Sequence, residues 1–158
     1  MTQAFSLTAA GTQPAEGMYA LMPNRPHPHN CKFYSATETD KIHAGAFVKL
    51  YGSSTSTTNP VVVAAAATDV PYGMVVYDAV KSENKVGDFV ALAQSGDSVF
   101  LVAGGAIAVG AKLQFNATTR KVDDTTTSSN AYIGVAETAA SADGDFIQVK
   151  LDFNLGVA

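Results

Sequence analysis

The sequence predicts an all-β protein: a single compact β-sandwich or barrel-like domain that follows an extended N-terminal arm. Three observations predict this class. From residue 42 onward, short runs of β-branched and aromatic residues alternate with turn residues, and no 3.6-residue period persists. Residues 1–41 hold four of the six prolines, which favours an extended segment there. With 158 residues, the chain is long enough to bury a core without disulfides.

The strands are expected where β-branched and aromatic residues cluster between turn residues. The clearest is Phe146–Phe153, in which apolar and polar residues alternate, so one face meets a core and the other meets solvent or a neighbour. The eight expected strands are Phe47–Gly52, Val61–Ala66, Gly73–Tyr77, Phe89–Ala93, Ser98–Leu101, Lys112–Asn116, Ile133–Ala136 and Phe146–Phe153.

We expect the boundary between the arm, residues 1–41, and the β-rich domain, residues 42–158, to follow the change in pattern. The arm carries large apolar residues without a strand or helix period, which is unusual for a solvated tail. We therefore interpret it as a docking arm, with a disordered leader as the alternative. Its candidate anchors to a partner protein or a neighbouring subunit are Phe5, Leu7, Tyr19 and Leu21.

Three six-residue segments, 45–50, 87–92 and 144–149, repeat one pattern: glycine, a small or acidic residue, phenylalanine and an aliphatic residue. This pattern predicts a tight turn that leads into a strand, with phenylalanine and the aliphatic residue on opposite faces. The unequal spacing argues against a solenoid, which needs a fixed period. We expect all three phenylalanines to be buried at equivalent strand starts. The defining residues are Gly45, Phe47, Gly87, Asp88, Phe89, Gly144, Asp145 and Phe146.

Composition argues against several classes of partner. Charged residues make up 15% of the chain, against roughly 25% in ordinary soluble domains. The net charge is −4, and no basic run is present to neutralise phosphates, so we expect no nucleic-acid binding. The longest apolar run, residues 61–67, is far shorter than a membrane span needs, and no secretory signal is recognisable. A surface with few charges is less costly to bury, which favours an assembly component.

No motif predicts catalysis, a cofactor or a metal. His27 and His29 lie near Cys31, but one such cluster without a partner is weak evidence for zinc. Asp88 and Asp145 each follow a glycine, where aspartate caps its own turn, so we do not interpret them as paired catalytic carboxylates. We therefore expect a protein that is not an enzyme, with no catalytic, cofactor-binding or metal-binding residues.

From about Gly45 to Phe153 the order of elements resembles that of the phage structural cement family, the decoration proteins of tailed-phage heads. Each piece is common by itself, and the joint order carries the resemblance. The pieces are Gly45–Leu50, Gly73–Tyr77, Gly87–Val90, Gly104–Ala106, Gly110–Leu113, Tyr132–Glu137 and Gly144–Leu151.

The resemblance implies a structural protein that binds the outer surface of a phage capsid and stabilises contacts between capsomers of the major capsid protein. It implies no catalysis, a homo-oligomer (a trimer, with a dimer as the alternative), and a place on the virion exterior after assembly in the host cytoplasm. The alternative function is a β-sandwich binding module, such as a carbohydrate-binding or adhesive head-fibre domain, or a tail component. The absence of tryptophan disfavours a sugar site, because sugars stack on exposed aromatic rings.

Overall fold

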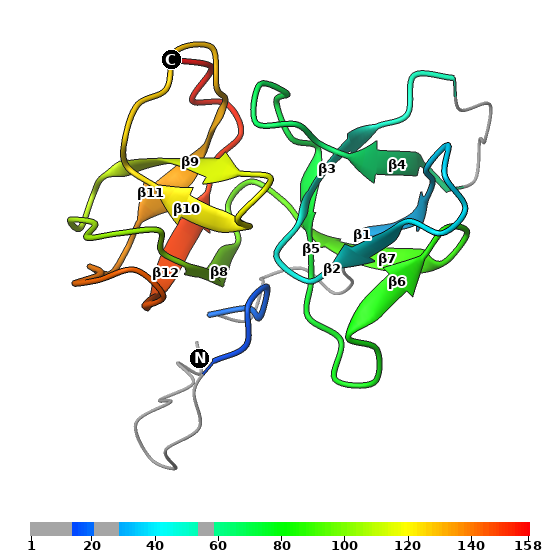
Figure 1. Cartoon of the computed structure of the whole chain (residues 1–158), viewed down its shortest axis with the longest axis horizontal. Coiled ribbons are helices and arrows are strands. Elements are labelled where there is room, and N and C mark those ends of the chain that lie inside the picture. The colour runs from blue at the N-terminus through cyan, green and yellow to red at the C-terminus, as the bar shows by residue number, and fades with distance from the viewer. Residues whose placement is uncertain (1–13, 21–28, 54–58) are drawn as a thin grey trace.

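The computed structural model describes residues 14–20, 29–53 and 59–158 (Figure 1). These residues form β-strands and no helix, which confirms the all-β class. None of the described segments is therefore a helix with the length and apolarity that a membrane crossing needs. The strands are β1 (His29–Phe33), β2 (Lys41–His43), β3 (Phe47–Leu50), β4 (Val61–Ala64), β5 (Gly73–Val75), β6 (Glu83–Lys85), β7 (Phe89–Ala93), β8 (Ser98–Val102), β9 (Lys112–Asn116), β10 (Lys121–Asp123), β11 (Tyr132–Ala136) and β12 (Phe146–Leu151).

All eight strands expected from the sequence are present, and four others were not expected. Three of the four, β2, β6 and β10, are only three residues long, too short to show an alternating pattern. The fourth, β1, directly follows the proline-rich stretch and lies within residues 1–41, which the sequence predicts to be an extended arm.

Strands β1, β4, β3, β5 and β7 close into a barrel in that order, which we call barrel 1. β1 pairs parallel with β4 and antiparallel with β7, so it closes the barrel. The two-stranded ribbon β2–β6 lies beside it. Because successive side chains of a strand point to opposite faces, every second side chain points into the barrel. The resulting core of barrel 1 comprises Cys31, Phe33, Ile42, Val48, Val62, Val75, Val90 and Leu92.

Strands β10, β9, β11, β12 and β8 form a second sheet in that order, which we call barrel 2. A parallel bridge between Ala103 and Val122 joins the ends of its two edge strands, and Gly104 N–H donates to the Val122 carbonyl at 2.8 Å. The sheet is therefore curled into a barrel-like form.

The two barrels share one topology: β1, β4, β3, β5 and β7 have β8, β10, β9, β11 and β12 as counterparts in the same order. Hydrogen bonds between loops repeat as well. Gly45 N–H donates to Val75 O at 2.8 Å, and Gly110 N–H donates to Ala136 O at 2.8 Å. The ribbon pair Ile42–Asn84 likewise corresponds to the bridge Ile107–Ala140. The chain is an internal duplication of one barrel unit.

The repeated sequence pattern reflects this duplication only in part. Gly87 N–H donates to Phe33 O at 2.8 Å, and Gly144 N–H donates to Ala103 O at 2.9 Å, so these two glycines are true counterparts. Gly45 precedes β3, whose counterpart β9 follows Gly110 instead. The expectation of three equivalent strand starts is therefore wrong for the segment at Gly45.

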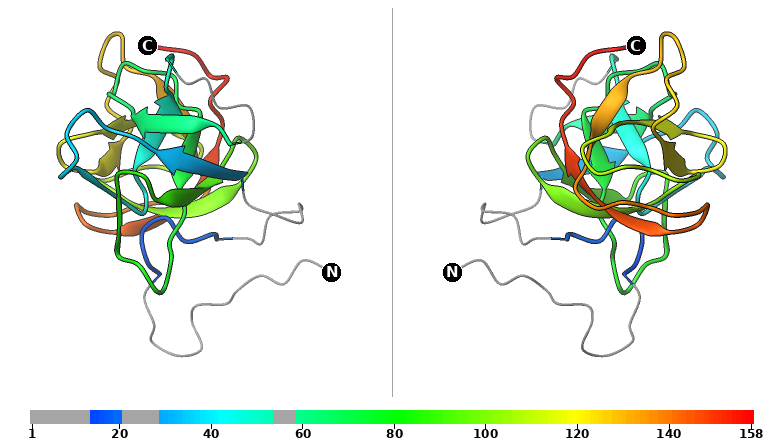
Figure 2. Two further views of the ribbon diagram at one scale, coloured as in Figure 1. Left: turned by 90° about the vertical axis from the view of Figure 1, so that its right-hand side faces the viewer. Right: turned by 90° about the vertical axis from the view of Figure 1, so that its left-hand side faces the viewer.

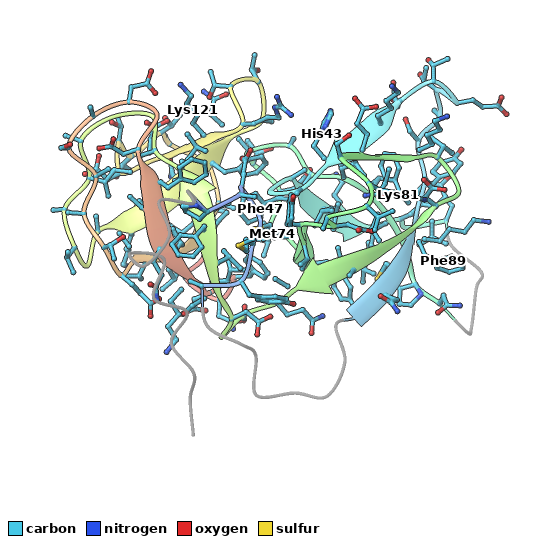
Figure 3. All side chains as sticks on the ribbon, turned by 90° about the horizontal axis from the view of Figure 1, so that it is seen from below. His43, Phe47, Met74, Lys81, Phe89 and Lys121 are labelled. Atoms are coloured by element: carbon cyan, nitrogen blue, oxygen red, sulfur yellow. The ribbon has the colours of Figure 1, made fainter. Side chains whose placement is uncertain are left out.

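The barrels pack through an aromatic contact. The ring centroid of Phe47 lies 4.7 Å from that of Phe115 and 6.2 Å from that of Phe153. Phe47 is 2% exposed, and Met74 beside it is fully buried. Figure 3 places both residues between the barrels, and along the long axis one barrel lies behind the other (Figure 2). A single buried cluster thus joins the face of barrel 1 to the core of barrel 2.

The expectation that all three phenylalanines of the repeated pattern are buried is wrong for Phe89, which is 60% exposed, and Phe146 is only half-buried. The aliphatic neighbours Val90 and Ile147 occupy the barrel cores instead. Phe47 also points away from its own core, which Val48 fills. It is buried because barrel 2 covers it, whereas Phe89 lies at the far end of barrel 1 (Figure 3).

Candidate interaction surfaces

Residues 14–20 form a clasp that contacts both barrels. Gly17 N–H donates to Phe100 O at 2.8 Å, and Ala20 N–H donates to Ser98 O at 2.7 Å, so the clasp adds to the free edge of β8. Tyr77 N–H of barrel 1 donates to Gly17 O at 3.0 Å. Gly17 has φ +76°, and a Cβ there would lie 2.6 Å from the backbone N of Gly45, so the close approach requires glycine.

Of the four arm residues expected to be anchors, Tyr19 lies in this clasp and bridges Val99 of β8. It therefore contacts its own subunit, which the sequence did not predict. Phe5, Leu7 and Leu21 lie outside the described residues. The arm boundary expected at residue 41 differs from the structure, because β1 and β2 belong to the fold.

Glu16 is the acidic residue of the clasp. A Cβ on Gly45 would collide with its side chain, so the two residues are in close contact. Burial raises the pKa of the Glu16 carboxyl above its ordinary value, and the positive charge of Arg120 opposes that rise. The carboxyl therefore belongs to the junction between the clasp, barrel 1 and the β9–β10 turn.

The carboxylates of Asp88 and Asp145 cap the turns in which they lie. The Asp88 carboxylate accepts a hydrogen bond from Lys85 N–H at 2.9 Å, and that of Asp145 accepts one from Ala142 N–H at 2.9 Å. The preceding Gly87 and Gly144 have φ near +90°, which type II and related turns require. The two carboxylates lie at counterpart positions of different barrels, and each is hydrogen-bonded within its own turn.

These capping bonds predict a pH dependence. Hydrogen bonds from the Ser141 hydroxyl and backbone N–H, and from Ala142 N–H, hold the pKa of Asp145 below its ordinary value. A lowered folded-state pKa gives stability that is present above the ordinary carboxyl pKa and lost as pH falls through the lowered value. We expect Asp145→Ala to lower the urea midpoint at pH 7 and to change it much less at pH 2. Asp124→Ala, an exposed aspartate in barrel 2, is the control; an equal loss for Asp145→Ala at both pH values would contradict the assignment.

In the part of the chain that the structure describes, the residues with metal or nucleophile chemistry are not grouped into a site. Cys31 is fully buried in the core of barrel 1, and burial raises the pKa of its thiol to about 11. His27 lies outside the described residues, and the side chain of His29 does as well. Among the described side chains, no three of His, Cys, Asp or Glu are grouped to hold a metal ion.

A groove of about 480 Å³ opens on barrel 1 beside β3 and β4. Leu50 on its wall is 50% exposed, and the rings of Tyr34 and Tyr51 lie 4.5 Å apart at a tilt of 33°. A hydrogen bond between the two tyrosine side chains raises the pKa of Tyr34. The lining residues are Phe33, Tyr34, Ser35, Ala36, Asp40, Lys41, Lys49, Leu50, Tyr51, Gly52, Val63 and Ala64.

The charged groups that line the groove all have partners on the protein. The ammonium of Lys49 lies 2.8 Å from an Asp69 carboxylate oxygen, that of Lys41 pairs with Glu83, and the Asp40 carboxylate accepts a hydrogen bond from the Ser35 hydroxyl at 2.6 Å. The groove therefore combines an apolar and aromatic wall with neutralised charged groups. The sequence does not predict that Leu50 is exposed, because Leu50 has the same strand parity as buried Val48 and is expected to be core.

Comparison with known proteins agrees with this architecture. The structure of the "head fiber gp8.5 N base" of bacteriophage phi29 superposes with a TM-score of 0.51 at 17% identity. The match covers 78% of this chain and 92% of that one, which supports a shared fold. No curated protein matches the sequence.

Residues 34–151 match the phage cement protein family, about three-quarters of the 158 residues. The matched region starts just after β1 and ends with the last residue of β12, so it takes in most of both barrels. A structural role associated with the phage capsid, within the virion, follows from this match. The chain belongs to the phage cement protein family.

Proposed function

We propose that this protein binds the outer surface of a phage capsid and stabilises contacts between capsomers of the major capsid protein. The observation that carries the proposal is the membership of the cement family together with the open apolar groove of barrel 1. Contiguous exposed apolar surface with a polar rim is typical of protein-interaction sites. Each copy contributes modest binding energy, and many copies on one shell resist rupture together.

The proposal is tested by adding the purified protein to heads of its own phage that were assembled without it. We expect the protein to co-sediment with these heads and to raise the temperature at which they release their DNA. Bovine serum albumin is the control for trapping in the pellet. Binding without any gain in rupture temperature would contradict the stabilising role, and a protein that stays in the supernatant would contradict capsid binding.

We also propose a homotrimer, with a dimer as the alternative. The low content of charged residues and the exposed apolar side chain of Phe89 favour association, because little charge has to be desolvated. The apolar residues Phe5 and Leu7, which precede the clasp, are proposed to add a contact to the capsid or to a neighbouring subunit. Light scattering at micromolar concentration tests the oligomer, and a monomeric mass would contradict it.

A carbohydrate-binding or adhesive role is the second candidate. One observation favours it: Tyr34 and Tyr51 form a partly exposed aromatic pair at the groove, where a sugar ring could stack. A glycan array distinguishes the roles. A strong hit that Tyr34→Ala abolishes would favour the adhesive role, whereas no hit together with head binding supports the capsid role.

A further inference from the structure

The duplication shows how a surface like the barrel 1 groove is covered in this fold. In barrel 1, Leu50 of β3 pairs with Val62 of β4, and Val62 pairs in turn with Phe33 of β1. In barrel 2, Phe115 of β9 pairs with Val122 of β10, and Val122 forms a bridge with Ala103, which follows β8. Leu50 and Phe115 are therefore counterparts. Phe115 is only 7% exposed, against 50% for Leu50.

The difference in exposure arises because barrel 1 covers the surface around Phe115. The ring of Phe47 packs on Phe115, and Ala131 N–H of barrel 2 donates to Ala67 O of barrel 1 at 2.8 Å. Ala67 also lines a hollow of about 210 Å³ beside Phe115. The surface around Phe115 in barrel 2 is thus covered by Phe47, an aromatic side chain on the outward face of barrel 1, and by the barrel 1 loop that holds Ala67.

The hollow in barrel 2 and the groove in barrel 1 are built at the same positions. Their shared positions lie along β3 and β4 in one barrel and along β9 and β10 in the other. In barrel 1 nothing in the described chain covers them, which leaves the larger volume. The matching residues are Lys49 and Gln114, Leu50 and Phe115, Tyr51 and Asn116, Gly52 and Ala117, and Val63 and Asp123.

A second copy of this chain that repeats the inter-barrel contact is a poor occupant for the groove. The covering face of barrel 1 consists of Phe47, Met74 and Ala93, which are cross-strand neighbours. The counterpart face of barrel 2 carries Lys112 and Lys150 beside Val135, and both lysines are exposed. Repeating the inter-barrel contact between copies would bury two ammonium groups against Leu50, which is costly. The two lysines therefore disfavour end-to-end addition of further copies through this contact.

We propose that the barrel 1 groove receives an apolar sheet face of the capsid protein that presents an aromatic side chain onto Leu50, between Tyr51 and Val63. This inference rests on the proposed function and specifies its contact. The aromatic side chain of the partner would cover Leu50 of barrel 1 in the way that the ring of Phe47 covers Phe115 of barrel 2. The tyrosine pair supplies the matching aromatic wall.

The test compares Leu50→Lys with Val109→Lys, since Val109 is an exposed valine (65%) on barrel 2, away from the groove. Both side chains are at least half exposed, so a lysine at either position can reach solvent and both variants should melt like the wild type. We expect Leu50→Lys to weaken binding to heads about tenfold or more, because it buries a charge at the contact, and Val109→Lys to bind normally. If the wild type binds and Leu50→Lys binds equally well, the groove is not the contact, and capsid binding itself survives. If the wild type does not bind, the proposed function fails.

A second measurement identifies the occupant. The variant with p-benzoylphenylalanine in place of Val63 is bound to heads assembled without this protein and irradiated, and the cross-linked peptides are mapped. We expect a capsid-protein peptide with an exposed aromatic residue. Cross-links only between copies of this chain would overturn the choice of partner, and saccharide binding that competes with heads would overturn the class of ligand.

Discussion

Replacing Phe47 by alanine is expected to lower the free energy of unfolding by about 3–5 kcal/mol, the usual cost of truncating a buried phenylalanine. The ring fills the junction between the barrels, and its loss removes contacts with both Phe115 and Phe153. Because a domain of this size is typically stable by about 5–15 kcal/mol, the variant should lose a large part of its stability.

The matched control is Phe89→Ala, which removes the same atoms from a position that is 60% exposed. We expect a change of less than about 1 kcal/mol there, because little apolar surface is lost from the interior. The measurement is urea unfolding of both variants against the wild type. Equal losses for the two variants would show that Phe89 is covered in solution, for example by a second copy, and near-neutral Phe47→Ala would show that the barrels do not depend on this contact.

Strand positions were predictable from the sequence because alternation and turn glycines are local signals. Phe89–Ala93 and Lys112–Asn116 coincide with β7 and β9 at both ends. Which side of a strand faces a core was harder to predict, since Phe47 and Phe89 have the same parity relative to their aliphatic neighbours. Only the position of barrel 2 makes one of them buried, and that position depends on contacts between residues far apart in the chain.

The candidate groove could not be predicted for the same reason. Leu50 and Phe115 occupy counterpart positions, yet one is open and the other covered, because one barrel has a neighbour on that side. The duplication itself left only a partial trace in the sequence. Its backbone hydrogen bonds repeat closely, whereas the side chains at Phe47 and Lys112 differ completely, so the topology persists where the residues do not.

Deleting residues 1–41 is expected to prevent folding, although the sequence predicts that this segment is an arm outside the β-rich domain. The deletion removes β1, which closes barrel 1 between β4 and β7. It also removes Cys31 and Phe33, which are 0% and 2% exposed. Losing a buried phenylalanine alone costs about 3–5 kcal/mol, and the open edges of β4 and β7 add unpaired backbone groups. The total approaches the whole stability of such a domain.

Shorter truncations separate the contributions. Removing residues 1–13 keeps the clasp and all strands, so we expect a melting temperature close to that of the wild type. Removing residues 1–20 deletes the clasp and exposes the edge of β8. The hydrogen bonds that Gly17 makes with both barrels are lost, so we expect a folded but less stable protein. Circular dichroism and thermal melts of the three truncations provide the measurement. A cooperative melt of the 1–41 deletion at the wild-type temperature would show that β1 is dispensable, and that the barrel closes on β4 and β7 without it.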